Sequence, residues 1–297
     1  MRKNKMLRHG SLFSGIGGFD LASTWMNWQN IFSCEIDPFC QKILKHYWPN
    51  IHHHENICHL DATQYRGLVD IISGGFPCQP FSQVGRRKGK SDDRYLWPQT
   101  RRIIEEARPQ WIVLENVTGL FTILEPERIS EMEIKEIELF CADKEYKTTK
   151  TIVSLQRRVI ATIISEINAA GYILPKLNDG TPVILCIPAC AMGAPHRRDR
   201  VWFVAHAGSE RLERPNTGQE NRQSTWSCEI PDWINWSTQS PVCGPDDGIP
   251  RKMDGITFPK WRTESIKALG NAIVPQIALE LFKVIDTVER EMKNNSL

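Results

Sequence analysis

Short apolar runs alternate with amphipathic stretches over the first 120 residues of the chain. The apolar runs end in glycine, proline or acidic residues, which is typical of buried strands followed by turns. The strands expected are 7–13, 31–36, 69–73 and 111–114, and helices are expected at about 18–28 and 38–47. Strands that alternate with helices predict βαβ units and an α/β fold with a mostly parallel sheet. Such a sheet binds its ligands at the carboxyl ends of its strands.

The second half of the chain is less regular. Residues 125–150 hold eight acidic and five basic side chains together with an amphipathic run, which predicts an exposed helical insertion. A helix that stops at Gly171 is expected next, then strands at 183–187 and 201–205, and a last helix from Pro275 to about Lys293. Residues 206 to about 250 are polar and have no periodicity, so no regular element is expected there.

Composition narrows the class of protein. The 297 residues are 41% hydrophobic and 24% charged, which argues against a disordered or repetitive chain. No run approaches the roughly 20 apolar residues of a membrane span, and no signal peptide is expected. Nine cysteines without a framework spacing favour a reducing compartment. Residues 52–54, 58 and 59 are histidines and a cysteine, but they lack a second cluster at zinc-like spacing, so we expect surface histidines and no metal.

Net charge gives a misleading first impression. The total of 37 basic and 35 acidic side chains leaves +2, which at first argues against a nucleic-acid partner. Residues 86–102, however, hold seven basic and two acidic side chains, a local charge of +5. The near-neutral total therefore combines opposed surfaces and is compatible with a basic cleft.

The segment SGGFPCQPFS at 73–82 has the strongest chemical signal. Its cysteine, Cys78, follows a buried strand in a turn restricted by two prolines and two glycines. A cysteine at the carboxyl end of a sheet becomes a nucleophile where positive charge or backbone N–H groups favour its thiolate. A buried structural cysteine is the alternative when this segment is taken alone.

Three further segments accompany it: the glycine turn SLFSGIGGF at 11–19, ENV at 115–117 and GAPHRRDR at 193–200. A glycine turn with an acidic residue, Glu35, one strand later suits a nucleoside whose ribose hydroxyls need an acceptor. The turn is not a dinucleotide fingerprint, because the position of its last glycine is occupied by Asp20. This departure disfavours a nicotinamide-dependent oxidoreductase.

Together with ALGNAIVP at 268–275, these blocks resemble the DNA (cytosine-5) methyltransferases of bacteria and phages, in the order of that family. The resemblance implies a Rossmann-like, doubly wound, mixed but mostly parallel sheet with a small irregular target-recognition domain. It also implies S-adenosylmethionine as methyl donor, S-adenosylhomocysteine as product, no metal, and double-stranded DNA as substrate. The family alternatives are a tRNA cytosine-5 methyltransferase and a catalytically inactive DNA-binding module.

The resemblance also implies the chemistry. Cys78 would add to carbon-6 of a flipped cytosine, and Glu115, protonated through a raised pKa, would contact the ring nitrogen-3 and the exocyclic amine. Arg200 would bind the 2-oxo group, and Arg198 would support the site. The cofactor-binding residues implied are Phe13, Gly15, Gly17, Glu35, Ile36, Asn56, Phe76, Leu96 and Asn271. The DNA-binding residues implied are Gln79, Ser82, Arg86, Arg87 and Lys88.

The family pattern is not matched everywhere. Asn56 stands where the family has an aspartate that reads the adenine amino group, so Asn56 would use its side-chain carbonyl. His196 stands where the family favours glutamine.

The resemblance also predicts the organisation and setting of the chain. The expected regions are a catalytic domain at 1–205 with the helical insertion at about 125–150, a target-recognition region at 206–255, and a segment at 256–297 that returns to the catalytic domain. We expect a cytoplasmic monomer in a bacterial cell or phage-infected host. It would have no membrane association, and a cognate restriction endonuclease would be encoded separately.

Overall fold

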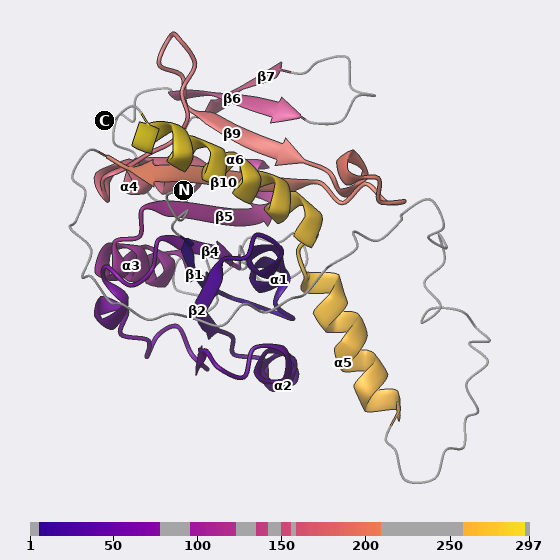
Figure 1. Ribbon diagram of the computed structural model, residues 1–297. Helices are drawn as coiled ribbons and strands as arrows, with labels where there is room; N and C mark the ends of the chain where they lie inside the picture. Colours follow the sequence, from indigo (N-terminus) through magenta and orange to yellow (C-terminus); the bar gives the residue numbers. More distant parts are fainter. Residues whose placement is uncertain are drawn as a thin grey trace.

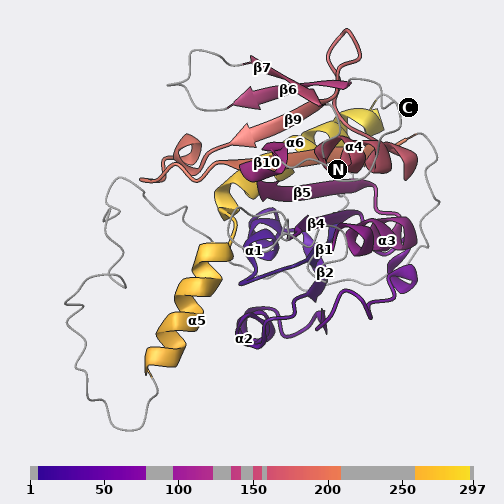
Figure 2. The ribbon, with the colours of Figure 1, turned by 180° about the vertical axis from the view of Figure 1, so that it is seen from behind.

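A computed structural model describes residues 6–77, 96–122, 135–141, 150–155, 159–208 and 258–294. One mixed sheet runs through it with helices on both faces (Figure 1, and from behind in Figure 2). The strands are β1 (Arg8–Leu12), β2 (Gln29–Cys34), β3 (His52–His54), β4 (Ile71–Gly75), β5 (Trp111–Val117), β6 (Lys135–Cys141), β7 (Lys150–Leu155), β8 (Tyr172–Ile173), β9 (Val183–Ile187) and β10 (Arg200–Ala207). The helices are α1 (Gly18–Trp25), α2 (Pro38–Tyr47), α3 (Trp97–Ala107), α4 (Val159–Ala169), α5 (Phe258–Asn271) and α6 (Pro275–Asn294), with short 3-10 turns at Thr63–Tyr65, Thr118–Thr122 and Ala189–Met192.

The sheet order is β3-β2-β1-β4-β5-β10-β9-β6-β7, and β8 pairs with β10 beside this path. The first five strands in this order are parallel, and β10 is antiparallel to both β5 and β9. The order reverses between β1 and β4, as in a doubly wound sheet. Because these strands are parallel, the carboxyl ends of β1, β2, β4 and β5 lie at one edge (the right-hand edge in Figure 1). The predicted doubly wound, mostly parallel sheet is thereby confirmed.

Strand alternation explains why helices cover both faces. Along β5, Trp111 and Val113 pack with α1 and α6, whereas Ile112 and Leu114 pack with α3 and α4. Successive side chains of a strand point to opposite faces, so a strand buried on both sides reads as a continuous apolar run. That run is what made β5 visible in the sequence.

Local signals fix the helix ends near the site. The Asp37 carboxylate accepts hydrogen bonds from the backbone N–H groups of Phe39 and Cys40, and Pro38 occupies the first turn, so α2 begins there. Gly171, expected to stop the helix that is α4, has φ 88°, in the left-handed region.

The expected helical insertion is wrong where the structure describes it. Residues 135–141 form β6, which pairs in parallel with β9 and antiparallel with β7. Within this segment Ile137 and Leu139 alternate with Glu136 and Glu138, a period of two that indicates a strand. The flanking parts of 125–150 lie outside the described residues, as does the predicted recognition region from 209 onward.

Among the described residues, one stretch, Trp261–Met292, meets the length and hydropathy of a membrane span, contrary to the expectation from the sequence. It is not one continuous helix, because α5 ends at Asn271 and α6 begins at Pro275. The apolar face of α6 is buried against the sheet and α1. This burial is what a core helix of a globular domain requires.

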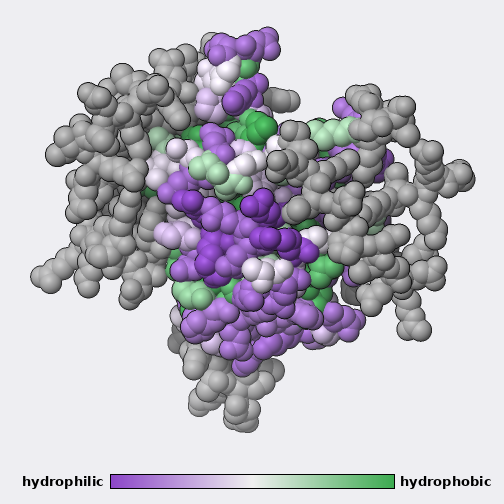
Figure 3. All heavy atoms as spheres, turned by 90° about the vertical axis from the view of Figure 1, so that its left-hand side faces the viewer, coloured by the Kyte–Doolittle hydropathy of each residue, from purple (hydrophilic) through white to green (hydrophobic). Residues whose placement is uncertain are grey.

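The opposite edge, where the parallel strands begin, has a different character. Figure 3 views this end of the molecule, and its described side chains are largely hydrophilic. The predicted residues of the glycine turn, Glu35 and Glu115 lie instead at the carboxyl edge, and we place the candidate site there.

Candidate active site

Glu115 and Arg200 form a close pair at the carboxyl end of β5. The register sets Glu115 beside Gly75 of β4 and beside Trp202 of β10, two residues after Arg200. Arg200 Nε lies 2.8 Å from Glu115 Oε1, and the Glu115 side chain is 11% exposed. Burial raises the pKa of Glu115 to about 7, although Arg200 and Arg198 act in the opposite direction. A carboxyl group near the carboxyl edge can thus hold a proton at neutral pH.

The chain that leaves β4 is tied to the same place. Asn116 donates from Nδ2 to the Phe76 carbonyl at 3.0 Å, and its Oδ1 accepts from the backbone N–H of Val117. A Cβ on Gly75 would lie 2.9 Å from Glu115 Oε2, so this position leaves no room for a side chain beside the carboxylate. The ENV motif therefore supplies the Glu115 carboxyl group and, through Asn116, fixes the main chain at Phe76, two residues before Cys78.

The nucleophile candidate itself is not described. Cys78 and the predicted DNA-binding residues lie outside the described residues, the latter being Gln79, Ser82, Arg86, Arg87 and Lys88. Their assigned roles stay predictions.

Arg198 connects the site to the C-terminal segment. Its guanidinium donates to the carbonyls of Gly270, at 2.8 Å, and Ala272, at 2.5 Å. Its backbone has φ 40°, and burial lowers the pKa of its side chain. Arg198 thus fastens the end of α5 to the start of β10 through hydrogen bonds to two backbone carbonyls.

The glycine turn after β1 is held by Glu35. Glu35 Oε2 accepts from the Gly15 N–H at 2.7 Å, and Oε1 accepts from the Asp37 N–H at 2.8 Å. Gly15 and Gly17 have φ 55° and 87°, and Phe13, before them, has φ 51°. Glycine adopts such angles without a steric penalty, which is why the turn needs this sequence. The structure therefore brings together the predicted residues of the turn and Glu35.

Two more predicted residues meet at a cavity next to this turn. Its volume is about 660 Å³, and it lies between the end of β2, α2 and the segment after β3. It is lined by Ile36, Pro38, Gln41, His54, Glu55, Asn56, His59 and Leu60. Asn56 Oδ1 accepts from the backbone N–H of Cys58 at 2.9 Å, so the carbonyl expected to face a ligand also supports its own turn.

Other predicted cofactor residues lie apart from this cavity. The Phe76 ring packs on Trp97 with centroids 5.3 Å apart, inside the core. Leu96 packs against the cluster of buried residues that includes Leu12 and Phe32 of β1 and β2, as Phe13 also does. Asn271 is exposed at the end of α5, in the segment that Arg198 holds.

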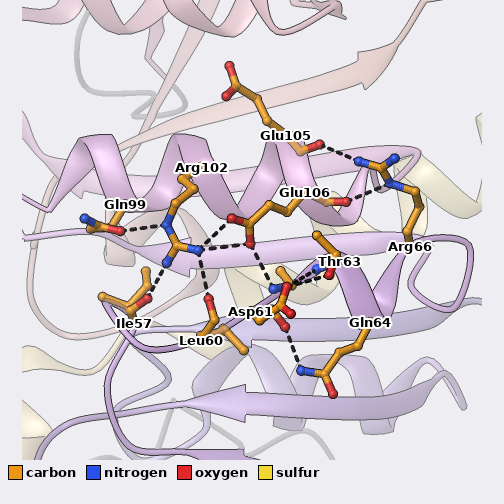
Figure 4. A network of polar contacts seen from close by, with 11 residues as sticks. Ile57, Leu60, Asp61, Thr63, Gln64, Arg66, Gln99, Arg102, Glu105 and Glu106 are labelled. Atoms are coloured by element: carbon orange, nitrogen blue, oxygen red, sulfur yellow. Dashed lines mark hydrogen bonds and ion pairs between the residues drawn. The ribbon is translucent and has the colours of Figure 1, made fainter.

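Sequence reasoning missed the residues that support these loops. Asp20, noted only as a departure from a fingerprint, is fully buried and accepts from Ser11 Oγ at 2.9 Å. Arg102 contacts the segment after Asn56 (Figure 4). Arg102 and Glu106 are opposite charges four residues apart on a helix, and this spacing was the signal in the sequence that could have indicated Arg102.

The chemistry of this edge fits the adenosine part of S-adenosylmethionine. The Glu35 carboxylate is a hydrogen-bond acceptor for ribose hydroxyls, and Ile36, 69% exposed, offers an apolar surface to a purine beside polar Asn56. The positive-φ glycines Gly15 and Gly17 let a ligand approach the backbone closely. Among the described residues, no group of three or more histidine, cysteine, aspartate or glutamate side chains could hold a metal ion.

The sheet order and the glycine turn define the class of Rossmann-like α/β proteins. Residues 7–138 match the family described as C-5 cytosine-specific DNA methylase, which confirms the resemblance over this part of the chain.

Similar proteins carry corresponding names. The type II methyltransferase M.DsaV of Dactylococcopsis salina is 37% identical over 120 residues, which are 40% of this chain and 33% of that protein. The type II methyltransferase M.AluI of Cellulosimicrobium cellulans is 28% identical over 222 residues, 70% of this chain and 36% of that protein. A solved structure of a DNMT2 mutant from Spodoptera frugiperda has a TM-score of 0.46 and 19% identity, covering 71% of this chain and 53% of that one. The matched regions span about a third of the length of these curated relatives.

Proposed function

We propose that the protein transfers a methyl group to carbon-5 of cytosine in a specific duplex DNA sequence. The observation that carries the proposal is the ion pair of buried Glu115 and half-buried Arg200, with the pKa of Glu115 raised to about 7, beside the strand that leads to Cys78. The match of residues 7–138 to the C-5 cytosine-specific DNA methylase family and the similarity to type II methyltransferases support it.

The proposed mechanism starts at Cys78. Its thiolate adds to carbon-6 of the ring, and the electron pair of the 5,6 double bond moves toward carbon-5, which then attacks an electrophilic methyl group. Removal of the carbon-5 proton expels the thiolate and restores the double bond. Carbon-5 of free cytosine is too weak a nucleophile for direct attack, so the addition divides one difficult step into two easier ones.

Glu115 and Arg200 would act on the opposite edge of the ring. Protonated Glu115 donates a hydrogen bond to nitrogen-3, and its other oxygen accepts from the exocyclic amine. Arg200 stabilises the negative charge that develops toward the 2-oxo group. The Glu115 pKa near 7 supports this role, because a carboxyl group at its ordinary pKa would be almost fully ionised at neutral pH.

S-adenosylmethionine, when bound, supplies the methyl group. We propose that Glu35 accepts from its ribose hydroxyls and that Ile36 and Asn56 border its adenine in the cavity. The turn from Phe13 to Gly17 would pass beside its remaining part, and Phe76, Leu96 and Asn271 would support the pocket from the surrounding elements.

The remaining roles concern DNA and organisation. Gln79, Ser82, Arg86, Arg87 and Lys88 would contact the backbone around a base that is flipped out of the duplex. Residues 1–205 would be the catalytic domain, 206–255 would read the target, and 256–297 would return to the catalytic domain. The packing of α6 on α1 and the sheet supports the last assignment. We also propose a cytoplasmic setting and a separately encoded restriction endonuclease, and the similarity to type II methyltransferases supports both.

Methyl transfer to DNA tests the proposal. The full chain, with a radiolabelled methyl donor, should label unmethylated genomic DNA at cytosine carbon-5, and Cys78→Ser should abolish labelling while leaving cofactor binding nearly intact. DNA that contains 5-fluorocytosine should trap a covalent adduct, because fluorine replaces the proton that must leave. Preferential labelling of competing tRNA would favour the tRNA alternative, and labelling by Cys78→Ser would refute the covalent mechanism.

A further inference from the structure

Arg102, in the middle of α3, holds the segment that follows Asn56. Its guanidinium donates from Nη2 to the Ile57 carbonyl at 2.7 Å and from Nη1 to the Leu60 carbonyl at 2.8 Å. Both carbonyls belong to the turn between Asn56 and the 3-10 helix at Thr63–Tyr65 (Figure 4). One side chain thus replaces the hydrogen bonds that a turn without regular structure cannot make within itself.

The guanidinium is itself fixed on α3. Nε donates to Gln99 Oε1 at 2.8 Å, and Nη1 lies 2.8 and 3.0 Å from the two Glu106 carboxylate oxygens. Glu106 Oε2 also accepts from the backbone N–H of Ala62 at 2.9 Å. The pair therefore contacts the turn at Ile57, Leu60 and Ala62, and leaves its main chain little freedom.

This turn borders the cavity of the candidate site. Asn56 and Leu60 line the cavity, and Ile57 between them is buried in the core below β1 and β2. A displacement of the carbonyls at Ile57 and Leu60 would therefore displace the Asn56 side chain and the wall that Leu60 forms.

We infer that Arg102 is a positioning residue for the adenine end of the cofactor, acting through the turn at 57–62 and together with Glu106. This inference rests on the proposed function. The arrangement needs arginine, because a planar fork reaches two backbone carbonyls and a carboxylate at once, and a lysine ammonium offers its donors from a single point.

The neighbouring Arg101 provides a matched control. It lies on the same helix, but its contacts are Glu105 at 2.8 Å and Glu166 at 3.4 Å, away from the turn. Arg101→Met and Arg102→Met remove the same charge and the same number of atoms from adjacent positions.

The test is the binding of S-adenosylhomocysteine and of adenosine to the full chain, measured calorimetrically at a temperature where every variant is folded by circular dichroism. We expect Arg102→Met to weaken both ligands by the same factor, about ten- to a hundredfold, because both carry the adenine. Arg101→Met should bind both as the wild type does. In the methylation assay, Arg102→Met should raise KM for the cofactor and leave kcat at saturating cofactor within about twofold.

Contradictory outcomes are separable. Wild-type protein that binds neither ligand would overturn the proposed function, whereas tight binding by the wild type and Arg102→Met alike would overturn the positioning role alone. A lowered kcat at saturating cofactor would likewise contradict it. If Arg102→Met does not fold, Glu106→Gln carries the test, because it keeps the shape but lacks a second acceptor for Arg102 and Ala62. We expect that variant to bind both ligands about three- to tenfold more weakly, and unchanged binding would overturn the inference.

Discussion

Glu115 is a carboxyl group that the fold keeps away from water while giving it a cationic partner, Arg200. Burial disfavours the ionised form and the arginine favours it, and the resulting pKa of about 7 means that burial has the larger effect. The pair is therefore poised between an ion pair and a neutral acid beside a cation. A catalytic group that must donate a hydrogen bond at neutral pH needs this balance.

The balance can be tested by removing the cation. We expect Arg200→Met to raise the pKa of Glu115 above its wild-type value, because the charge that stabilises the carboxylate is lost while the burial remains. Carbon-13 NMR titration of glutamate carboxyl carbons, assigned by comparison with Glu115→Gln, measures both values. A lower pKa in Arg200→Met would contradict the assignment of Arg200 as the group that stabilises the carboxylate, and a wild-type pKa near the ordinary value would contradict burial as the dominant cause.

Asp20 is a second buried acid, and its effect is on stability. Burial raises its pKa from 3.8 to about 7, against the hydrogen bond from Ser11. Between these two values the folded state binds a proton that the unfolded state has released. The free energy of unfolding should therefore fall as the pH rises from about 4 to about 7.

Asp20→Asn removes this titration. We expect the wild type to lose about 1–3 kcal/mol more unfolding free energy than the variant between pH 5 and pH 8, since one pKa unit corresponds to about 1.4 kcal/mol. Urea titrations of both proteins at the two pH values measure the difference. The buried His9, whose pKa is lowered to about 4, titrates in both proteins and cancels. Equal pH dependence would show that the Asp20 carboxyl is ionised throughout.

At the scale of elements, the turn between β1 and α1 combines two constraints. Gly15 and Gly17 both have positive φ, but their surroundings differ. A Cβ on Gly17 would lie 2.4 Å from a ring carbon of Trp48, whereas a Cβ on Gly15 would have no atom within 4 Å. Glycine is thus needed at position 15 for its backbone conformation, since no atom of the described residues crowds it. Position 17 needs glycine both for its backbone conformation and because Trp48 leaves no space for a side chain.

Alanine substitutions separate these constraints. Gly15→Ala should cost about 1 kcal/mol of unfolding free energy from the left-handed backbone. Gly17→Ala should cost about 1–3 kcal/mol more, because Trp48 and the end of α2 must move. Chemical denaturation of the two variants checks the order. Equal losses of unfolding free energy in the two variants would mean that the Trp48 ring can move aside without destabilising the fold.

Elements were predictable where their own sequence determines them. The apolar run of β5, the proline and aspartate at the start of α2, and Gly171 after α4 are local signals that the structure confirms. The three histidines of β3 carry no strand signal and become a strand by pairing with β2. The site divides in the same way. Glu35 lies at the end of one predicted strand and Glu115 follows another, whereas Arg102 acts through a contact with a residue 45 positions away in sequence.

The whole molecule depends on a closure between the two ends of the chain. Phe282 of α6 packs on Trp28 with ring centroids 4.8 Å apart, and on Phe19 and His9 at 6.4 and 5.7 Å. These partners belong to α1, β1 and the turn before β2, which build the glycine turn of the site. The C-terminal helix therefore completes the core beneath residues encoded more than 250 positions earlier.

Truncation of Phe282 tests this closure. Because the ring is fully buried, Phe282→Ala should cost about 3–5 kcal/mol of unfolding free energy. Val284→Ala, on the same helix but 62% exposed, should cost less than about 1 kcal/mol. Both values come from urea denaturation followed by tryptophan fluorescence. If α6 were only an appendage to a core complete without it, the two variants would unfold at the same urea concentration. A large loss in Phe282→Ala alone would instead mean that the first strands and the last helix unfold as one unit.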